Sequence, residues 1–117
     1  MHELSITEGI LNTAIEEARQ RNAVRITQII LGMGQLSYVV PECVQDYFDM
    51  LSEDTIAHGA KLTFNYIPAV LECRECNSRF PMQHMRLRCP NCSGTKVDII
   101  EGKDFYIDKL EIETDDR

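Results

Sequence analysis

The stretch Cys73-Arg-Glu-Cys76 is followed, after twelve residues, by Cys89-Pro-Asn-Cys92. A C-x-x-C turn directs two thiolates toward one point in space, and two such turns supply the four sulfurs of a tetrahedral metal site. The polar linker between the pairs holds too few apolar residues to build a hydrophobic core. The stretch therefore predicts a structural zinc site through all four cysteines, with the metal holding the segment together.

Two alternatives to zinc remain open from these residues. A pair of C-x-x-C disulfides is a redox arrangement, and one of them would normally stand at the start of a helix. Pro90 lies inside the second pair and no amphipathic helix follows either pair, which argues against disulfides. Iron is the second alternative, because the pattern Cys-Pro-x-Cys-x-Gly from Cys89 to Gly94 also occurs in rubredoxin-like knuckles.

Length and composition indicate one compact domain, or one domain with a small satellite. The chain has 117 residues, of which 44% are hydrophobic. Residues 69–103 carry six basic and four acidic side chains, a net charge of +2, whereas the rest carries six basic and fifteen acidic side chains, a net charge of −9. Nucleic-acid binders usually present a clear basic face, so this balance argues against DNA or RNA as a partner.

The sequence carries no signal for a membrane or for secretion. No apolar run approaches the length needed to span a bilayer. The N-terminus is not basic and has no long apolar block, so it does not have the features of a signal peptide. Metal-spaced cysteines without an export signal favour the reducing cytoplasm.

Hydrophobic periodicity predicts two helices. Ser5 and Glu8 have the spacing of a capping box with Ser5 as the N-cap, and the first helix is expected to end near Asn22. Pro41 opens the second helix. The apolar stripes at helical spacing are Ile6, Ile10, Leu11, Ala14, Ile15 and Ala18 in the first helix and Val44, Tyr47, Phe48 and Leu51 in the second.

Four segments have the pattern of β-strands, namely residues 24–31, 61–66, 96–100 and 105–113. The strand at 24–31 is expected to end where the glycines of Gly32-Met-Gly34 interrupt its pattern. In the last, strict alternation would place Tyr106, Leu110 and Ile112 on one face and Phe105 and Ile107 on the other.

The predicted fold class is α+β, with two helices packed on a small mixed β-sheet and an inserted zinc-ribbon-like module. Residues 1–68 and 104–117 form the α/β domain in this prediction. Residues 69–103 form the inserted zinc-binding module, which is tied to the domain at both of its ends.

His2 is a second candidate metal ligand. The amine of Met1, the backbone nitrogen of His2 and its Nδ1 atom can chelate one ion in fused five- and six-membered rings, and the amide of Glu3 offers a further nitrogen. A planar set of nitrogens suits Ni²⁺ or Cu²⁺ and not tetrahedral zinc. The alternative is a solvated terminal histidine, because chain ends are usually frayed.

The other nucleophilic and basic side chains give weaker signals. Cys43 flanks the stripe of the second helix and is expected to be a small buried hydrophobe. His58 and His84 are expected at the surface, and Arg86 and Arg88 are expected to balance the thiolate charge. No phosphate-binding glycine loop, Ser/His/Asp set or paired-carboxylate motif stands out, so no enzyme activity is expected.

In combination, these features resemble the HypA/HybF family of hydrogenase nickel-incorporation metallochaperones. The resemblance covers the whole chain and rests on Met1-His2-Glu3-Leu4-Ser5-Ile6, Ile30-Leu-Gly-Met-Gly34 and the two C-x-x-C pairs. It implies that His2, with the backbone nitrogens of Met1, His2 and Glu3, holds nickel, and that the four cysteines hold structural zinc. Some members carry a histidine beside a zinc cysteine, whereas Asn77 and Ser93 occupy those places here.

The resemblance also implies delivery of Ni(II) during maturation of nickel–iron hydrogenase. The implied partners are a GTPase chaperone of the same pathway and the hydrogenase large-subunit precursor, and the chain is expected to be a monomer or a weak homodimer. Two other functions stay open: a zinc-ribbon module that binds protein or nucleic acid, and a rubredoxin-like iron redox protein.

Overall fold

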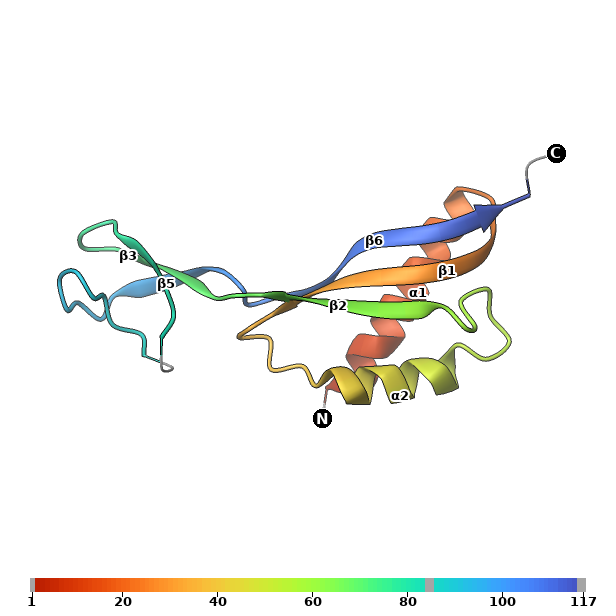
Figure 1. The fold of residues 1–117 in the computed structure, drawn as a ribbon, viewed down its shortest axis with the longest axis horizontal. Helices are drawn as coiled ribbons and strands as arrows, with labels where there is room; N and C mark the ends of the chain where they lie inside the picture. The colour runs from red at the N-terminus through yellow and green to blue at the C-terminus, as the bar shows by residue number, and fades with distance from the viewer. Residues whose placement is uncertain (1, 84–85, 116–117) are drawn as a thin grey trace. The chain divides into compact units, whose positions relative to one another are not determined.

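The computed structural model describes residues 2–83 and 86–115 and contains two helices and six strands in that part of the chain (Figure 1). In chain order they are α1 (Glu3–Gln20), β1 (Ala23–Gly34), α2 (Pro41–Leu51), β2 (Lys61–Ile67), β3 (Val70–Cys73), β4 (Arg79–Pro81), β5 (Val97–Glu101) and β6 (Phe105–Thr114). The chain divides into two compact units. Within the described residues, unit 1 comprises 2–32, 39–65 and 106–115, and unit 2 comprises 33–38 and 66–105.

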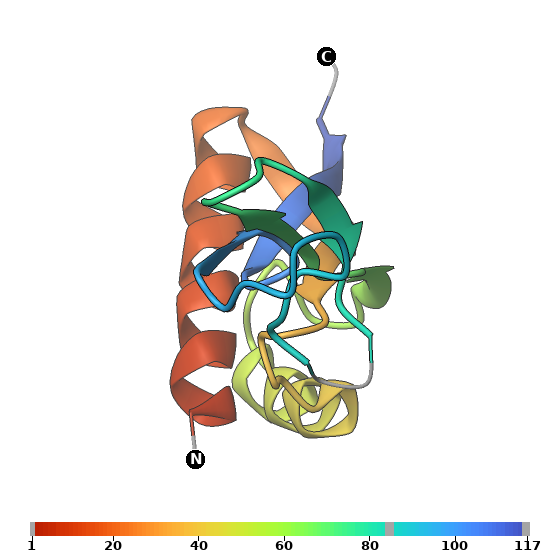
Figure 2. The same cartoon turned by 90° about the vertical axis from the view of Figure 1, so that its left-hand side faces the viewer.

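Unit 1 is built on a three-stranded sheet in the order β2-β1-β6. Figure 1 shows that β2 runs parallel to β1 and that β6 runs antiparallel to it. Side chains of β1 tie it to both neighbours, because Gln28 donates to Thr63 at 2.6 Å and Thr27 donates to the Glu111 carbonyl at 3.1 Å. The helices α1 and α2 pack against each other on one face of this sheet (Figure 2). The predicted α+β fold with a mixed sheet is confirmed.

The apolar stripe of α1 is confirmed, but the predicted start of the helix is wrong. Ile10, Leu11, Ala14 and Ala18 are buried. The helix begins at Glu3 with His2 as its N-cap, so Ser5 lies inside the first turn and is exposed. The Thr7 hydroxyl donates to the Glu3 carbonyl at 2.6 Å, and this buried bond helps to close the turn earlier than a capping box at Ser5 would.

Of the two glycines expected to end the first strand, Gly32 lies inside β1 and Gly34 is its last residue. A side chain on Gly32 would collide with the ring of Tyr106. The glycine therefore allows the aromatic ring of β6 to cross over the backbone of β1, which explains why it is compatible with a strand.

The strict alternation expected along β6 is wrong in its second half. Phe105, Ile107, Leu110 and Ile112 are half-buried, and the exposed Asp108 and Lys109 stand in succession between them, so the alternation shifts by one residue between Ile107 and Leu110. In β1 the buried positions Ile26 and Ile29 show the same irregularity. Such a shift changes which side chains of a strand face the core without changing its length.

The predicted core face of α2 is confirmed, with Val44 and Phe48 each 1% exposed. Cys43, expected to be buried, is exposed. It directly precedes Val44, and one residue corresponds to about 100° around a helix, which turns its side chain away from the core. Neither α1 nor α2 has the length and apolar character of a membrane-spanning helix.

Unit 2 has its own sheet, in the order β4-β3-β5, with both pairings antiparallel. The predicted strand at 96–100 corresponds to β5, whereas β3 and β4 have only four and three residues and were not predicted. The sheet carries a small core of Ala69, Leu71, Cys73, Phe80, Met82 and Cys89, with Leu36, Cys76, Val97 and Ile99 packed against it. The expectation that this segment lacks a core is therefore wrong, because strands on both sides of the linker contribute apolar residues.

Candidate metal centre

Unit 2 brings the four predicted cysteines together. The Sγ atoms of Cys73, Cys76, Cys89 and Cys92 all lie within 4.8 Å of one another, and the pairs Cys73–Cys92 and Cys76–Cys89 are 3.5 Å apart. Four sulfurs bound to zinc at about 2.3 Å would stand about 3.8 Å apart in a regular tetrahedron. The side chains fit a tetrathiolate metal ion, and all five cysteines of the chain are free, so the disulfide alternative is wrong.

The two C-x-x-C turns have the same backbone geometry. The residue after each pair, Asn77 or Ser93, has a left-handed φ of 62° or 61° and donates its N–H to the carbonyl of the first cysteine at 2.8 Å. The first cysteine donates its own N–H to the carbonyl of Ser78 or Gly94 at 2.9 Å. This repeated turn directs both sulfurs of a pair toward the same point, and asparagine is among the residues that adopt left-handed backbone most readily.

Two polar side chains contact the sulfur of Cys76. Its Sγ atom lies 3.2 Å from the Ser78 hydroxyl and 3.6 Å from Asn91 Nδ2. Hydrogen bonds from the Ser78 side chain and then from Asn91 stabilise the thiolate and lower the pKa of Cys76 to about 6. Neither residue belongs to the predicted ligand set, and their only signal in the sequence is their place inside or close to a C-x-x-C pair.

Cys92 has the opposite shift. The N–H of Gly94 lowers the pKa of Cys92, but hydrogen bonding with the sulfurs of Cys73, Cys76 and Cys89, together with desolvation, outweighs that effect and raises the pKa to about 12. Four sulfurs this close cannot all be thiolates unless a cation compensates their charge. The donor set therefore suits a soft, tetrahedral divalent ion, with zinc first and iron as the alternative.

His2 stands directly before α1 in unit 1. Its backbone has φ −106° and ψ −5°, its side chain makes no capping hydrogen bond, and the residue is exposed. Its carbonyl accepts the N–H of Ile6 at 2.9 Å, which closes the first turn. The backbone N–H groups of His2 and Glu3 therefore lie at the end of a helix, where no carbonyl of the helix can accept them. Met1, also part of the predicted ligand set, lies outside the described residues.

The other predicted residues do not join either group of ligands. His58 is exposed in the turns after α2, as expected. Arg86 and Arg88 are also exposed. His84 lies outside the described residues.

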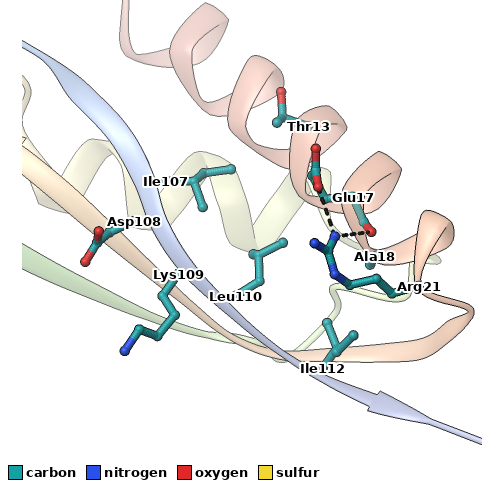
Figure 3. Close-up of a pocket in the computed structure, with 9 residues that line it drawn as sticks. All are labelled: Thr13, Glu17, Ala18, Arg21, Ile107, Asp108, Lys109, Leu110 and Ile112. Carbon is teal, nitrogen blue, oxygen red and sulfur yellow. Dashed lines mark hydrogen bonds and ion pairs between the residues drawn. The ribbon is translucent and has the colours of Figure 1, made fainter.

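Unit 1 contains a cavity of about 480 Å³ between α1 and β6 (Figure 3). Its apolar lining includes Ala18, Leu110 and Ile112, and the guanidinium of Arg21 on its rim is held by Glu17 at 3.1 Å. The lining contains no cysteine or histidine. The cavity therefore does not offer the nitrogen or sulfur ligands that a nickel or zinc site requires.

The comparisons with known proteins agree with this arrangement. The family model described as "Hydrogenase/urease nickel incorporation, metallochaperone, hypA" matches residues 1–112. A "Hydrogenase maturation factor HypA" of Caldanaerobacter subterraneus is 39% identical over 97% of this chain and 100% of its own length. A protein of the same name from Dehalococcoides mccartyi is 42% identical over 97% of this chain and 95% of its own length.

Solved structures support the fold independently. The solution structure of the Ni metallochaperone HypA from Helicobacter pylori superposes with a TM-score of 0.75, at 22% identity, and covers 98% of this chain and 100% of that one. The family name describes a metallochaperone and not an enzyme. Because the family match spans nearly the whole sequence, the chain belongs to the HypA family of nickel-incorporation metallochaperones.

Proposed function

We propose that this protein delivers Ni(II) during maturation of nickel–iron hydrogenase and binds it through His2 and neighbouring backbone nitrogens. Nickel is the cargo in this proposal, whereas zinc bound by Cys73, Cys76, Cys89 and Cys92 is structural. Family membership supports the first part, and the four converging sulfurs support the second.

The backbone angle of His2 is the observation that carries the nickel proposal. A metal bound by two successive backbone nitrogens closes a five-membered ring through Cα and the carbonyl carbon, and a flat ring of this kind requires ψ near 0°. His2 has ψ −5°, so its own nitrogen and that of Glu3 lie on the same side of the intervening bond. The exposed imidazole can complete the chelate from the same residue.

One electrostatic effect disfavours nickel binding at the N-terminus of α1. The N-terminus of a helix carries a partial positive charge, which disfavours a cation. Deprotonated amides would offset it, because each contributes a negative charge directly to the ion. Glu3, in the first turn of α1, adds a carboxylate nearby in sequence. Affinity should therefore fall steeply on acidification, since the amides must lose protons and the imidazole must be neutral.

The decisive variant is His2→Gln in protein with an untagged N-terminus. Glutamine is bulky enough to favour retention of Met1, whereas alanine at position two would favour its removal and so change two candidate ligands together. We expect His2→Gln to lower nickel affinity by more than about tenfold, equivalent to about 1.4 kcal/mol, in isothermal titration calorimetry. His58→Gln is the matched control and should bind nickel like the unmodified protein. Equal binding by both variants would refute His2 as a ligand.

A second experiment separates the two possible nitrogen sets. An added Gly-Ser-Gly before Met1 converts the terminal amine into an amide and places the new amine too far along the chain to close a fused chelate with the His2 imidazole. This extension should weaken binding if the amine of Met1 is a ligand and should have little effect if the amides of His2 and Glu3 complete the set. Nickel absorption spectra should indicate a planar, nitrogen-rich site in the unmodified protein.

The proposal also includes a compartment, two partners and the identity of the resident metal. Free, metal-spaced thiols suit the reducing cytoplasm. The partners proposed from the family resemblance are a GTPase chaperone of the maturation pathway and the hydrogenase large-subunit precursor, with this chain as a monomer or weak homodimer. A visible spectrum tests the identity of the resident metal, because an iron tetrathiolate is coloured and a zinc tetrathiolate is not.

A further inference from the structure

Unit 2 contains a hollow of about 400 Å³ beside the second C-x-x-C turn. Phe80, Pro81 and Pro90 supply its apolar lining, and Arg86 and Arg88 supply its charge. We call these five residues the arginine surface. A second hollow of about 390 Å³ is lined by Arg86, Arg88, Leu87 and Thr95. Both arginines therefore line both hollows.

The backbone fixes where the two arginines stand. The N–H of Arg86 donates to the Gln83 carbonyl at 3.0 Å, and these two residues form an antiparallel bridge. Arg88 directly precedes Cys89, whose N–H is bonded to the Gly94 carbonyl at 2.9 Å. Arg88 is therefore attached to backbone of the cysteine cluster, whereas Arg86 belongs to a turn closed on Gln83, and both residues are exposed.

Neither Arg86 nor Arg88 forms an ion pair with a residue of the described chain. The ion pairs found among residues 2–83 and 86–115 involve Arg21, Arg25, Arg74 and Arg79. No hydrogen bond in that part of the chain joins Arg86 or Arg88 to a cysteine sulfur, whereas Ser78 and Asn91 do contact one. The expectation that the two arginines balance the thiolate charge stays a prediction, and no hydrogen bond among the described residues joins either arginine to a sulfur. No carboxylate lines either hollow.

We infer that the arginine surface binds an extended, acidic segment of a partner protein, with an apolar side chain between two carboxylates. Guanidinium groups pair with carboxylates in a two-pronged geometry. The apolar lining accommodates an aliphatic side chain, and Leu87, 49% exposed, extends the apolar area. Nucleic acid fits less well, because the chain has a net charge of −7 and two arginines do not make a continuous basic face.

This inference does not depend on nickel binding, so it is tested on zinc-loaded, nickel-free protein. The probe is the acetylated and amidated peptide Gly-Ser-Glu-Leu-Glu-Ser-Gly, titrated into ¹⁵N-labelled protein at millimolar concentration while NMR shifts are followed. We expect shifts at Phe80, Arg86, Arg88 and Ser93. Replacing both glutamates of the peptide by glutamine, or its leucine by glycine, should weaken the binding.

The variant Arg86→Gln/Arg88→Gln should weaken peptide binding by about fivefold or more, the effect of losing two exposed ion pairs. The matched control is Arg74→Gln/Arg79→Gln, which makes the same charge change in unit 2 at arginines already paired with Asp98 and Glu72. Zinc content is measured for both variants, so that a loss of folding is recognised.

Three results would overturn the inference. Equal peptide affinity in the two double variants would assign the binding to overall charge. Tighter binding of a ten-nucleotide single-stranded DNA than of the peptide would make the surface a phosphate site. Shifts of the same residues on raising the protein concentration without peptide would identify the occupant as a second copy of this chain.

Discussion

Among single residues, two side chains outside the sulfur cluster contact one of its members. Ser78 and Asn91 hydrogen-bond the sulfur of Cys76, and these bonds lower the pKa of Cys76 to about 6. Removing them with Ser78→Ala/Asn91→Ala should raise that pKa, so protons should compete with zinc at a higher pH. We expect the midpoint of zinc release on acidification, followed with a zinc-sensitive dye, to move upward. The control is Ser93→Ala, which removes the serine hydroxyl that follows the second C-x-x-C pair. An unchanged midpoint of zinc release in the double variant would contradict a role for the two hydrogen bonds.

At the scale of elements, two glycines show how the same substitution has opposite effects in different surroundings. A Cβ atom on Gly34, at the end of β1, would collide with the backbone of Gly102, whereas one on Gly9 in α1 would meet nothing within 4 Å. Gly34→Ala should therefore destabilise the protein, because backbone must move to make room. Gly9→Ala should stabilise it by about 0.5–1 kcal/mol, the helix preference of alanine over glycine. Urea unfolding measures both, and a stabilised Gly34→Ala would show that the two backbones do not approach each other.

At the scale of the whole molecule, the two units differ in how they are stabilised. Unit 1 has helices packed on a sheet, whereas unit 2 has a core of six buried residues, two of which, Cys73 and Cys89, belong to the sulfur cluster. Folding units of this small size usually need a metal or disulfides. Chelation of zinc should therefore abolish protection from hydrogen exchange in β3 and β5 while α1 and β1 keep theirs. Protection of β3 and β5 that survives chelation would mean that the apolar core alone holds unit 2.

Patterns of neighbouring residues were enough to predict the features that depend on local backbone geometry. Helical spacing identified the buried faces of α1 and α2, and the C-x-x-C spacing identified all four members of the sulfur cluster. These patterns are reliable because 3.6-residue periodicity and the reach of a four-residue turn are local properties of the backbone. The N-terminal chelate was also suggested locally, and it remains a prediction.

Features that depend on a residue distant in the chain became visible only in the folded protein. The shifted alternation in β6 appears only in the folded sheet, since register is a property of two strands and not of one. The core of unit 2 was missed because Leu36 and Ile99 reach it from outside the linker. The contact of Asn91 with Cys76 joins the second C-x-x-C turn to the first. In each case the stabilising contact joins residues whose separation in sequence carries no periodic signal, so only the folded chain brings them together.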